Sequence, residues 1–303
     1  MKTSKYLTDP LYWDLTPLAH ERAQRGMDSR ANLEIQEIAQ GLDVKQAHGQ
    51  AARDYPQFEQ LIRGAFIFLK KIGYPVGGWA VDMGSGTGVG ACILSKYDTI
   101  EKVFAVEFSA GFVHHVMPIV FDKFGADFSK IQRVVGDFNN LQLEDNSVGV
   151  ILDIDSFHHS EDLDYTLREC YRAICWGGVV ISIDRAWPDS YTQEQLDAML
   201  DRELNDNLKC KYGISAGMSF TRRDFGEHEY TVGQWIRAYE RSGFFNVAAF
   251  SQWHPPGLNR IWLRLPTFEA SVILDSLLYR FGFRRFVIYG FAKTRTLFVS
   301  IKR

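Results

Sequence analysis

The stretch VDMGSGTGVG, residues 81–90, decides the fold of this chain. It follows a short apolar run at 79–83 and opens a segment of helical length. Its glycines permit a tight turn and a close approach of the backbone to a ligand, and the start of a helix attracts negative groups. The pattern therefore predicts a ligand-binding loop between a strand and a helix.

The spacing of this loop argues against a dinucleotide. In the fingerprint G-x-G-x-x-G/A, a start at Gly84 places Val89 at the last position, whereas a start at Gly86 places Ala91 there but sets the loop late. Asp82 stands at the entrance of the loop, where a buried carboxylate repels a pyrophosphate and suits a ligand with an ammonium or sulfonium group. The loop therefore favours a cationic ligand.

Further apolar, β-branched runs occur on both sides of helix-length segments. Nearly continuous runs of this kind are typical of parallel strands that are buried on both faces. Segments such as 163–175 then cross over as helices, which predicts an open α/β sheet. Further strands are expected at 102–108, 131–135, 148–154, 179–184, 244–251 and 296–301, and further helices at 58–72 and 232–241.

Two more acids follow predicted strands. Glu107 lies 23 residues after Gly84, where a carboxylate can accept hydrogen bonds from both hydroxyls of a ribose. Asp137 follows the third strand and can accept from an exocyclic amine, while Phe138 offers its backbone and ring face. Each acid alone fits a helix cap equally well, but the three acids together at strand ends favour a nucleoside site.

These motifs resemble those of class I S-adenosylmethionine-dependent methyltransferases. The resemblance covers residues 79–185 most clearly and is weaker through WIRAYERSGFFNV at 235–247 and TLFVSIKR at the end. It implies a Rossmann-like, doubly wound sheet of seven strands in the order 3-2-1-4-5-7-6, with the last strand antiparallel. Many members carry an aspartate where this chain has Gly149.

The resemblance also implies roles for individual residues, with S-adenosylmethionine as the cofactor. The loop residues Asp82, Gly84, Ser85, Gly86 and Gly88 would hold the methionine moiety. Glu107 would hold the ribose, and Asp137 with Phe138 the adenine. Asp153 and Asp155, two residues apart and so expected on one strand face, would lie near the methyl sulfonium.

The chain divides into an expected helical N-terminal lid, 1–76, and a methyltransferase domain, 77–303. Insertions at about 186–230 and 254–295 are expected to form a cap, the second of them a helical insertion before the last strand. Tyr12 and Trp13 are candidates for an aromatic wall of the site, although anchoring to the core explains them equally well.

Methyl transfer aligns a nucleophile with the sulfonium carbon and often removes a proton, a task suited to histidine. The candidates are His158 and His159 after the fourth strand, assisted by Asp155, and His228 within the acidic GEHEY segment. Generic packing and a solvated loop are the alternatives. No metal is assigned, although Asp153, Asp155 and Asp184 leave a magnesium site open.

Composition excludes several classes of protein. The 34 Lys and Arg residues are balanced by 37 Asp and Glu residues, which disfavours a dedicated nucleic-acid binder. No signal peptide and no apolar run of membrane length is present, and the four cysteines form no C-x-x-C pair, so a cytoplasmic protein is expected. The segment 254–303 carries nine basic and two acidic residues, which leaves a solvated face, a homodimer contact, a peripheral membrane contact and an anionic acceptor as alternatives.

The predicted function is transfer of a methyl group to a small molecule, with a hydroxyl of a sugar-like or natural-product substrate as the first choice. Methylation of nitrogen or carbon is the alternative within the same fold. A non-catalytic protein that binds the methyl donor is the alternative outside the enzymes.

Overall fold

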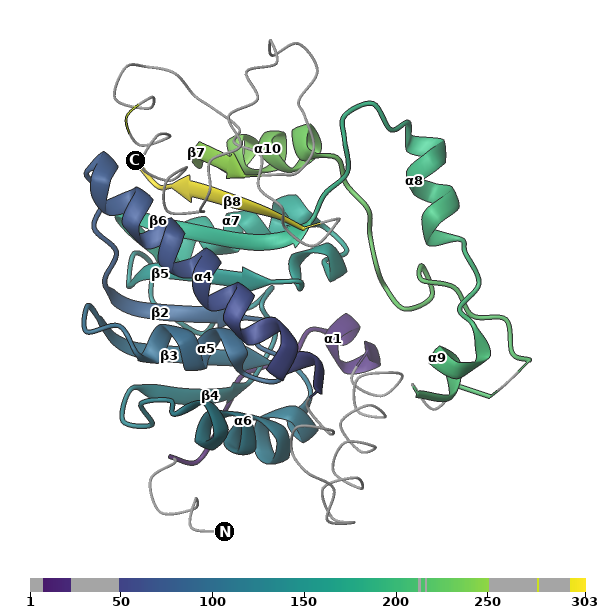
Figure 1. Ribbon diagram of the computed structural model, residues 1–303, viewed down its shortest axis with the longest axis horizontal. Helices are drawn as coiled ribbons and strands as arrows, with labels where there is room; N and C mark the ends of the chain where they lie inside the picture. The colour runs from purple at the N-terminus through teal and green to yellow at the C-terminus, as the bar shows by residue number, and fades with distance from the viewer. Residues whose placement is uncertain (1–7, 23–48, 212–213, 216, 251–276, 278–294) are drawn as a thin grey trace.

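The computed structural model describes residues 8–22, 49–211, 214–215, 217–250, 277 and 295–303. A single sheet of eight strands lies at its centre, in the order β1-β4-β3-β2-β5-β6-β8-β7 (Figure 1). The strands are β1 (Leu11–Tyr12), β2 (Gly78–Met83), β3 (Ile100–Glu107), β4 (Ile131–Val135), β5 (Val148–Ile154), β6 (Ile174–Arg185), β7 (Phe245–Phe250) and β8 (Arg295–Ile301).

Seven of these strands confirm the predicted order. Strands β2 to β6 run parallel, and β8 is antiparallel to both β6 and β7. The eighth strand is the two-residue β1, which pairs with β4 and was not predicted. A strand of two residues leaves no apolar periodicity to read.

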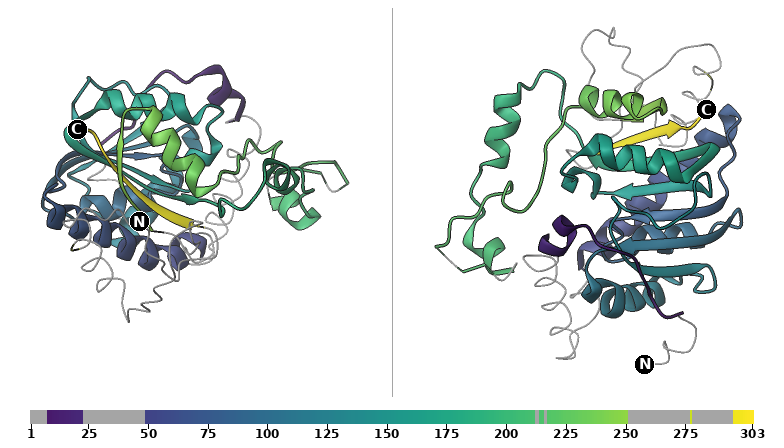
Figure 2. Two further views of the ribbon diagram at one scale, coloured as in Figure 1. Left: turned by 90° about the horizontal axis from the view of Figure 1, so that it is seen from above. Right: turned by 180° about the vertical axis from the view of Figure 1, so that it is seen from behind.

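Helices cover both faces of the sheet (Figures 1 and 2). On one face lie α4 (Gly49–Ile72), α5 (Val89–Ser95) and α6 (Met117–Phe124), and on the other lie α7 (Leu163–Ala173) and α10 (Val232–Arg241). The apolar side of α4 packs into the core through Leu61, Ile62 and Leu69, each at most 2% exposed. The predicted helix 58–72 is therefore the second half of a longer one, because its polar first turns carry no apolar stripe.

The N-terminal region is only partly the expected lid. Its described part runs from β1 into the short helix α1 (Pro17–Arg22), which lies near the carboxyl ends of the strands (Figure 2). Trp13 donates its backbone N–H to the Val135 carbonyl, 2.8 Å away, and its side chain packs against Phe104. Trp13 thus anchors this region to the core, and Tyr12 is 65% exposed beside His114, so neither forms a wall of the cavity described below.

The segment 186–230 carries α8 (Gln193–Leu200) and α9 (Asp206–Lys211) and extends beyond the carboxyl ends of the strands (Figure 1). The second expected insertion, 254–295, lies outside the described residues except for Leu277 and Arg295. Among the described helices, none is both long enough and apolar enough to cross a membrane.

Strand β6 begins five residues before its predicted start at 179. Ile174 pairs with Val148, and the register then shifts before Val179 pairs with Val150. Gly177 lies inside this stretch with φ +80°. The glycine pair therefore makes an irregularity within the strand rather than the predicted turn before it, and α7 ends at Ala173 instead of 175.

Candidate functional site

A cavity of about 430 Å³ opens at the carboxyl ends of the strands, within the size range of small-molecule sites. Its walls come from the glycine loop, from the ends of β3, β4 and β5, from α1 and α4, from segment 220–226 and from the start of β8. The lining residues are Leu18, Ala19, Glu21, Phe58, Asp82, Gly84, Ser85, Gly86, Thr87, Val89, Gly90, Glu107, Phe108, Phe112, Asp137, Phe138, Asn139, Ile154, Asp155, Ser156, His159, Glu161, Phe220, Arg223, Asp224, Phe225, Gly226 and Arg295.

Three predicted loop residues line the cavity, and Gly88 does not. Gly84 and Gly86 have φ values of +62° and +50°, which favour glycine, and the Ser85 amide donates to the Val106 carbonyl at 2.9 Å. Gly88 is the N-cap of α5, and a Cβ added to it would lie 2.5 Å from the Phe121 ring. Gly88 is therefore needed for packing of the helix, which corrects the expectation that it faces the ligand.

Asp82 lies at the end of β2 and holds the start of α5. Its carboxylate accepts the Ala91 amide at 2.7 Å and the Ser85 hydroxyl. Burial raises the pKa of this carboxyl to about 6, although both hydrogen bonds oppose that change. Asp82 thus keeps the loop in shape and presents an acid to the cavity.

Glu107 ends β3 and lies across the loop from Asp82. Its Oε2 accepts the Gly86 amide at 2.9 Å, and its Oε1 accepts the Ser109 amide at 3.0 Å. Burial raises the pKa of this carboxyl to about 7. Each oxygen retains a lone pair, so the carboxylate can accept two more hydrogen bonds from a ligand.

Asp137 and Phe138 follow β4 and line the same cavity. Asp137 accepts the Asn139 amide at 2.8 Å and the hydroxyl of Thr16, which precedes α1. The N-terminal segment is therefore tied directly to this end of the cavity. The structure thus brings Asp82, Glu107, Asp137 and Phe138 together, as their positions after strands predict.

Asp153 and Asp155 do not share a strand face. Asp153 lies within β5, is fully buried, and accepts from the Ser156 hydroxyl at 2.6 Å and from the Ser182 hydroxyl. Asp155 follows the strand with φ +52°, so the alternation of sides ends before it. Asp155 lines the cavity and Asp153 does not, which corrects the placement of Asp153 at a ligand.

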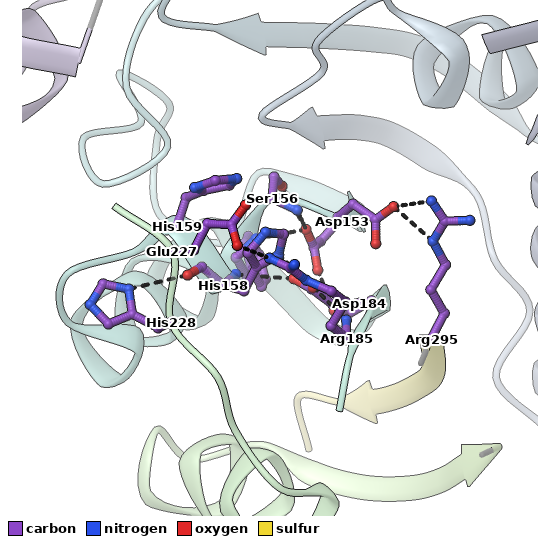
Figure 3. A network of polar contacts seen from close by, with 12 residues as sticks. Asp153, Ser156, His158, His159, Asp184, Arg185, Glu227, His228 and Arg295 are labelled. Atoms are coloured by element: carbon purple, nitrogen blue, oxygen red, sulfur yellow. Dashed lines mark hydrogen bonds and ion pairs between the residues drawn. The ribbon is translucent and has the colours of Figure 1, made fainter. Parts of the chain in front are cut away.

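Asp155 forms an ion pair with Arg295, the first residue of β8 (Figure 3). Arg295 Nε lies 2.7 Å from Asp155 Oδ2, and its guanidinium stacks 4.9 Å from the centre of the Phe58 ring. Asp155 Oδ1 is buried and has no hydrogen-bond partner among the described residues. A buried acceptor of this kind in a cavity wall is suited to a donor group on a ligand.

The three candidate histidines occupy different positions (Figure 3). His159 lines the cavity, and its Nδ1 lies 3.3 Å from the Gly226 carbonyl. His158 is buried behind it, with Nδ1 2.6 Å from Asp184 Oδ1, and burial lowers the pKa of this imidazole well below its ordinary value. His228 lies outside the cavity lining, with Nδ1 3.1 Å from the His158 carbonyl. The structure therefore brings only His159 of the three to the cavity.

The three aspartates considered for magnesium are already engaged by the protein. Asp184 accepts the His158 amide at 3.0 Å as well as contacting its ring, Asp153 binds two serines, and Asp155 pairs with Arg295. In addition, burial raises the pKa of Asp153 well above its ordinary value. These carboxylates form no oxygen cage of the kind that magnesium requires.

Segment 222–229 fixes the outer wall of the cavity. Arg222 donates Nε to Glu227 Oε2 at 2.5 Å, and its other donor reaches Glu229. Glu229 in turn accepts the Trp187 indole N–H at 2.5 Å, and the His228 amide donates to the His158 carbonyl at 2.8 Å. The acidic segment GEHEY is therefore a clamp that attaches this wall to the ends of β5 and β6.

The sequence did not identify several cavity residues as candidates. They include Phe58, Ile154, Ser156, Phe220, Arg223, Phe225 and Arg295. Aromatic and arginine residues in TRRDFGEHEY, next to a predicted cap, were an available signal for the segment 220–226. Arg295 carried no local signal, because its place in the cavity depends on the antiparallel pairing of β8 with β6.

Comparison with protein families identifies a methyltransferase domain at residues 81–182. This span contains the glycine loop, Glu107, Asp137 and the strand β5. No curated protein matches the chain.

Solved structures share the fold at low sequence identity. A protein of Galdieria sulphuraria, provisionally assigned as a sarcosine dimethylglycine methyltransferase, is 14% identical with a TM-score of 0.50, over 86% of this chain and 88% of that one. YcgJ of Bacillus subtilis is 17% identical with a TM-score of 0.48, over 80% and 99% of the two chains. Geranyl diphosphate C-methyltransferase of Streptomyces coelicolor, solved with Mg²⁺, geranyl diphosphate and S-adenosyl-L-homocysteine, is 12% identical with a TM-score of 0.47, over 80% and 77%.

Proposed function

Because residues 81–182 form a methyltransferase domain of the class I S-adenosylmethionine-dependent type, we propose that this enzyme methylates a hydroxyl group of a small, uncharged, polar molecule. One observation carries the proposal. A single cavity joins the acids of the glycine loop region to a second end that contains His159 and Asp155. Donor and acceptor can therefore bind side by side.

The first end of the cavity fits S-adenosylmethionine. Glu107, with two available lone pairs, would accept the ribose hydroxyls, and Asp137 with Phe138 would hold the adenine. Asp82 and the loop residues Gly84 to Gly86 would receive the methionine moiety, whose ammonium suits an acidic site. The bound cofactor supplies an activated methyl group, so the protein needs only to place and prepare the acceptor.

The second end supports an acceptor that donates hydrogen bonds. Asp155 Oδ1 would accept from the acceptor, and His159 would take the proton of the hydroxyl as its oxygen attacks the methyl carbon. Both arginines of the cavity are paired, Arg295 with Asp155 and Arg223 with Asp201 and Asp197. This pairing favours an uncharged acceptor over the anionic one considered from the sequence.

The direct test is calorimetric titration of the purified protein with S-adenosylmethionine and S-adenosylhomocysteine, with NAD as the control. The second step is transfer of radiolabelled methyl to a panel of sugars, phenols, alcohols and amines. Micromolar binding and labelling of a hydroxyl compound would support the proposal. Labelling confined to amines or carbon acids would replace it with N- or C-methylation, and binding of the donor without any transfer would favour a non-catalytic role.

Replacement of His159 with alanine is expected to reduce kcat about 100-fold or more, because the hydroxyl loses its proton acceptor. The affinity for S-adenosylmethionine should stay within about twofold, since His159 is not among the residues that we assign to the cofactor. Single-turnover transfer to the acceptor found in the panel measures the first effect, and calorimetry measures the second. His115→Ala, an exposed histidine on another surface, is the control. Unchanged turnover in His159→Ala would remove His159 from the mechanism.

The affinity for S-adenosylmethionine is expected to rise with pH between pH 6 and 7.5. The folded protein raises the pKa of Glu107 to about 7, so at pH 6 this carboxyl is mostly protonated. Ribose hydroxyls donate to the ionised form, and binding at pH 6 must first release the proton, which weakens it up to about tenfold. Calorimetry at several pH values should show this slope in the wild type and a flatter one in Glu107→Gln. Equal slopes in the two proteins would exclude Glu107 as the titrating group.

A further inference from the structure

Three metal-binding side chains converge beside the second end of the cavity. One donor atom each of His158, His159 and Glu227 lies within 4.8 Å of the other two (Figure 3). The two imidazole rings are 4.2 Å apart between centres. We propose that His158, His159 and Glu227 form a binding site for a divalent transition-metal ion, with zinc as the best fit.

The ring nitrogens of both histidines are already oriented. Asp184 Oδ1 engages Nδ1 of His158 at 2.6 Å, and the Gly226 carbonyl lies 3.3 Å from Nδ1 of His159. A histidine that binds a metal through one nitrogen commonly donates the other N–H to a carboxylate or a carbonyl in this way. Nε2 is then the atom that each ring offers to an ion.

Glu227 has the matching arrangement. Both of its ion pairs, with Arg222 Nε at 2.5 Å and with Arg185 at 3.1 Å, are made by Oε2. Oε1 takes part in neither of these ion pairs. The arginines therefore orient the carboxylate while one oxygen is left for an ion.

The donor set selects the type of ion. Two imidazoles with one carboxylate are the ligands of catalytic zinc sites and of other divalent transition ions, whereas magnesium and calcium prefer oxygen ligands. Three protein ligands also leave at least one coordination position open. Because His159 lines the cavity, that position adjoins the acceptor end.

The consequence of metal binding rests on the proposed function. The nitrogen of His159 that would take the acceptor's proton is the one that would bind the ion, so zinc and the proton compete for it. Zinc-loaded protein is therefore expected to transfer methyl groups at least tenfold more slowly than zinc-free protein, and a chelator should restore the rate.

The site is tested by titrating zinc into purified protein without a histidine tag, followed by calorimetry and by the visible spectrum of the cobalt-substituted form. We expect one ion per chain at micromolar affinity or tighter. His159→Gln and Glu227→Gln should each weaken binding by about 100-fold, and Asp184→Asn by about 10-fold. His115→Ala, which alters the other pair of consecutive histidines, His114 and His115, should leave the affinity unchanged.

Absence of stoichiometric binding, or binding that is equal in wild type, His159→Gln and Glu227→Gln, would overturn the proposal. Circular dichroism shows that each variant is folded, so that a loss of affinity is not a loss of structure. Titration of S-adenosylmethionine into the same samples separates the two proposals. Zinc binding without any binding of S-adenosylmethionine would remove the proposed function and leave the metal site standing.

Discussion

Replacement of Glu107 with alanine is expected to weaken the binding of S-adenosylmethionine by about 100-fold or more. Glu107 is 5% exposed and has two oxygens that each retain a lone pair beside the cavity. A hydrogen bond to a charged group contributes about 1.5–3 kcal/mol, and the variant loses two such bonds to the ribose. It also leaves the Gly86 and Ser109 amides without their acceptor, which loosens the glycine loop.

Calorimetry with S-adenosylhomocysteine measures this loss without any knowledge of the acceptor. Glu107→Gln keeps the shape but has one acceptor oxygen, and it should bind with intermediate affinity. Glu101→Ala is the matched control, because Glu101 lies near the other end of β3 and is exposed. Wild-type affinity in a folded Glu107→Ala protein would show that the ribose binds elsewhere.

The strands and the cofactor end of the cavity were predictable because they depend on local patterns. Strand β5 has the predicted bounds, and Glu107 and Asp137 lie where acids after parallel strands must lie, since those ends meet at one edge of the sheet. The same local reasoning failed for Asp155, whose positive φ turns it out of the strand's alternation. A backbone conformation of that kind leaves no trace in residue spacing.

The acceptor end was not predictable in the same way, because it is assembled from distant segments. Arg295 meets Asp155 only through the pairing of β8 with β6, 140 residues apart in the chain. His158 and His159 are adjacent in sequence, yet Asp184 holds one ring in the interior while the other lines the cavity. Only the packing of β6 against β5 decides which of the two faces a ligand.

Gly149 shows how a departure from the family pattern acquires a physical reason. Gly149 lies in β5, where the strand shifts register against β6 between Val148 and Val150. A Cβ at this position would lie 2.1 Å from the carbonyl oxygen of Gly77, just before β2. Many relatives carry an aspartate here, but in this chain the backbone of β2 approaches too closely for any side chain.

Gly149→Ala is therefore expected to destabilise the fold by about 3 kcal/mol, because a backbone carbonyl within the central sheet cannot move aside as a flexible side chain can. For a domain of this size, that corresponds to a fall in Tm of about 8 °C. Differential scanning calorimetry measures the change. Gly149→Asp should be worse, since it adds a charge to the same clash.

Gly73→Ala is the matched control for the Gly149 variants. Gly73 has φ +96° but open space around its Cβ position, so alanine there carries only the backbone strain of about 1 kcal/mol. The Tm of Gly149→Ala should consequently lie below that of Gly73→Ala. If the two variants melt together, the close approach of β2 to β5 does not explain why this chain has glycine where its relatives have an acid.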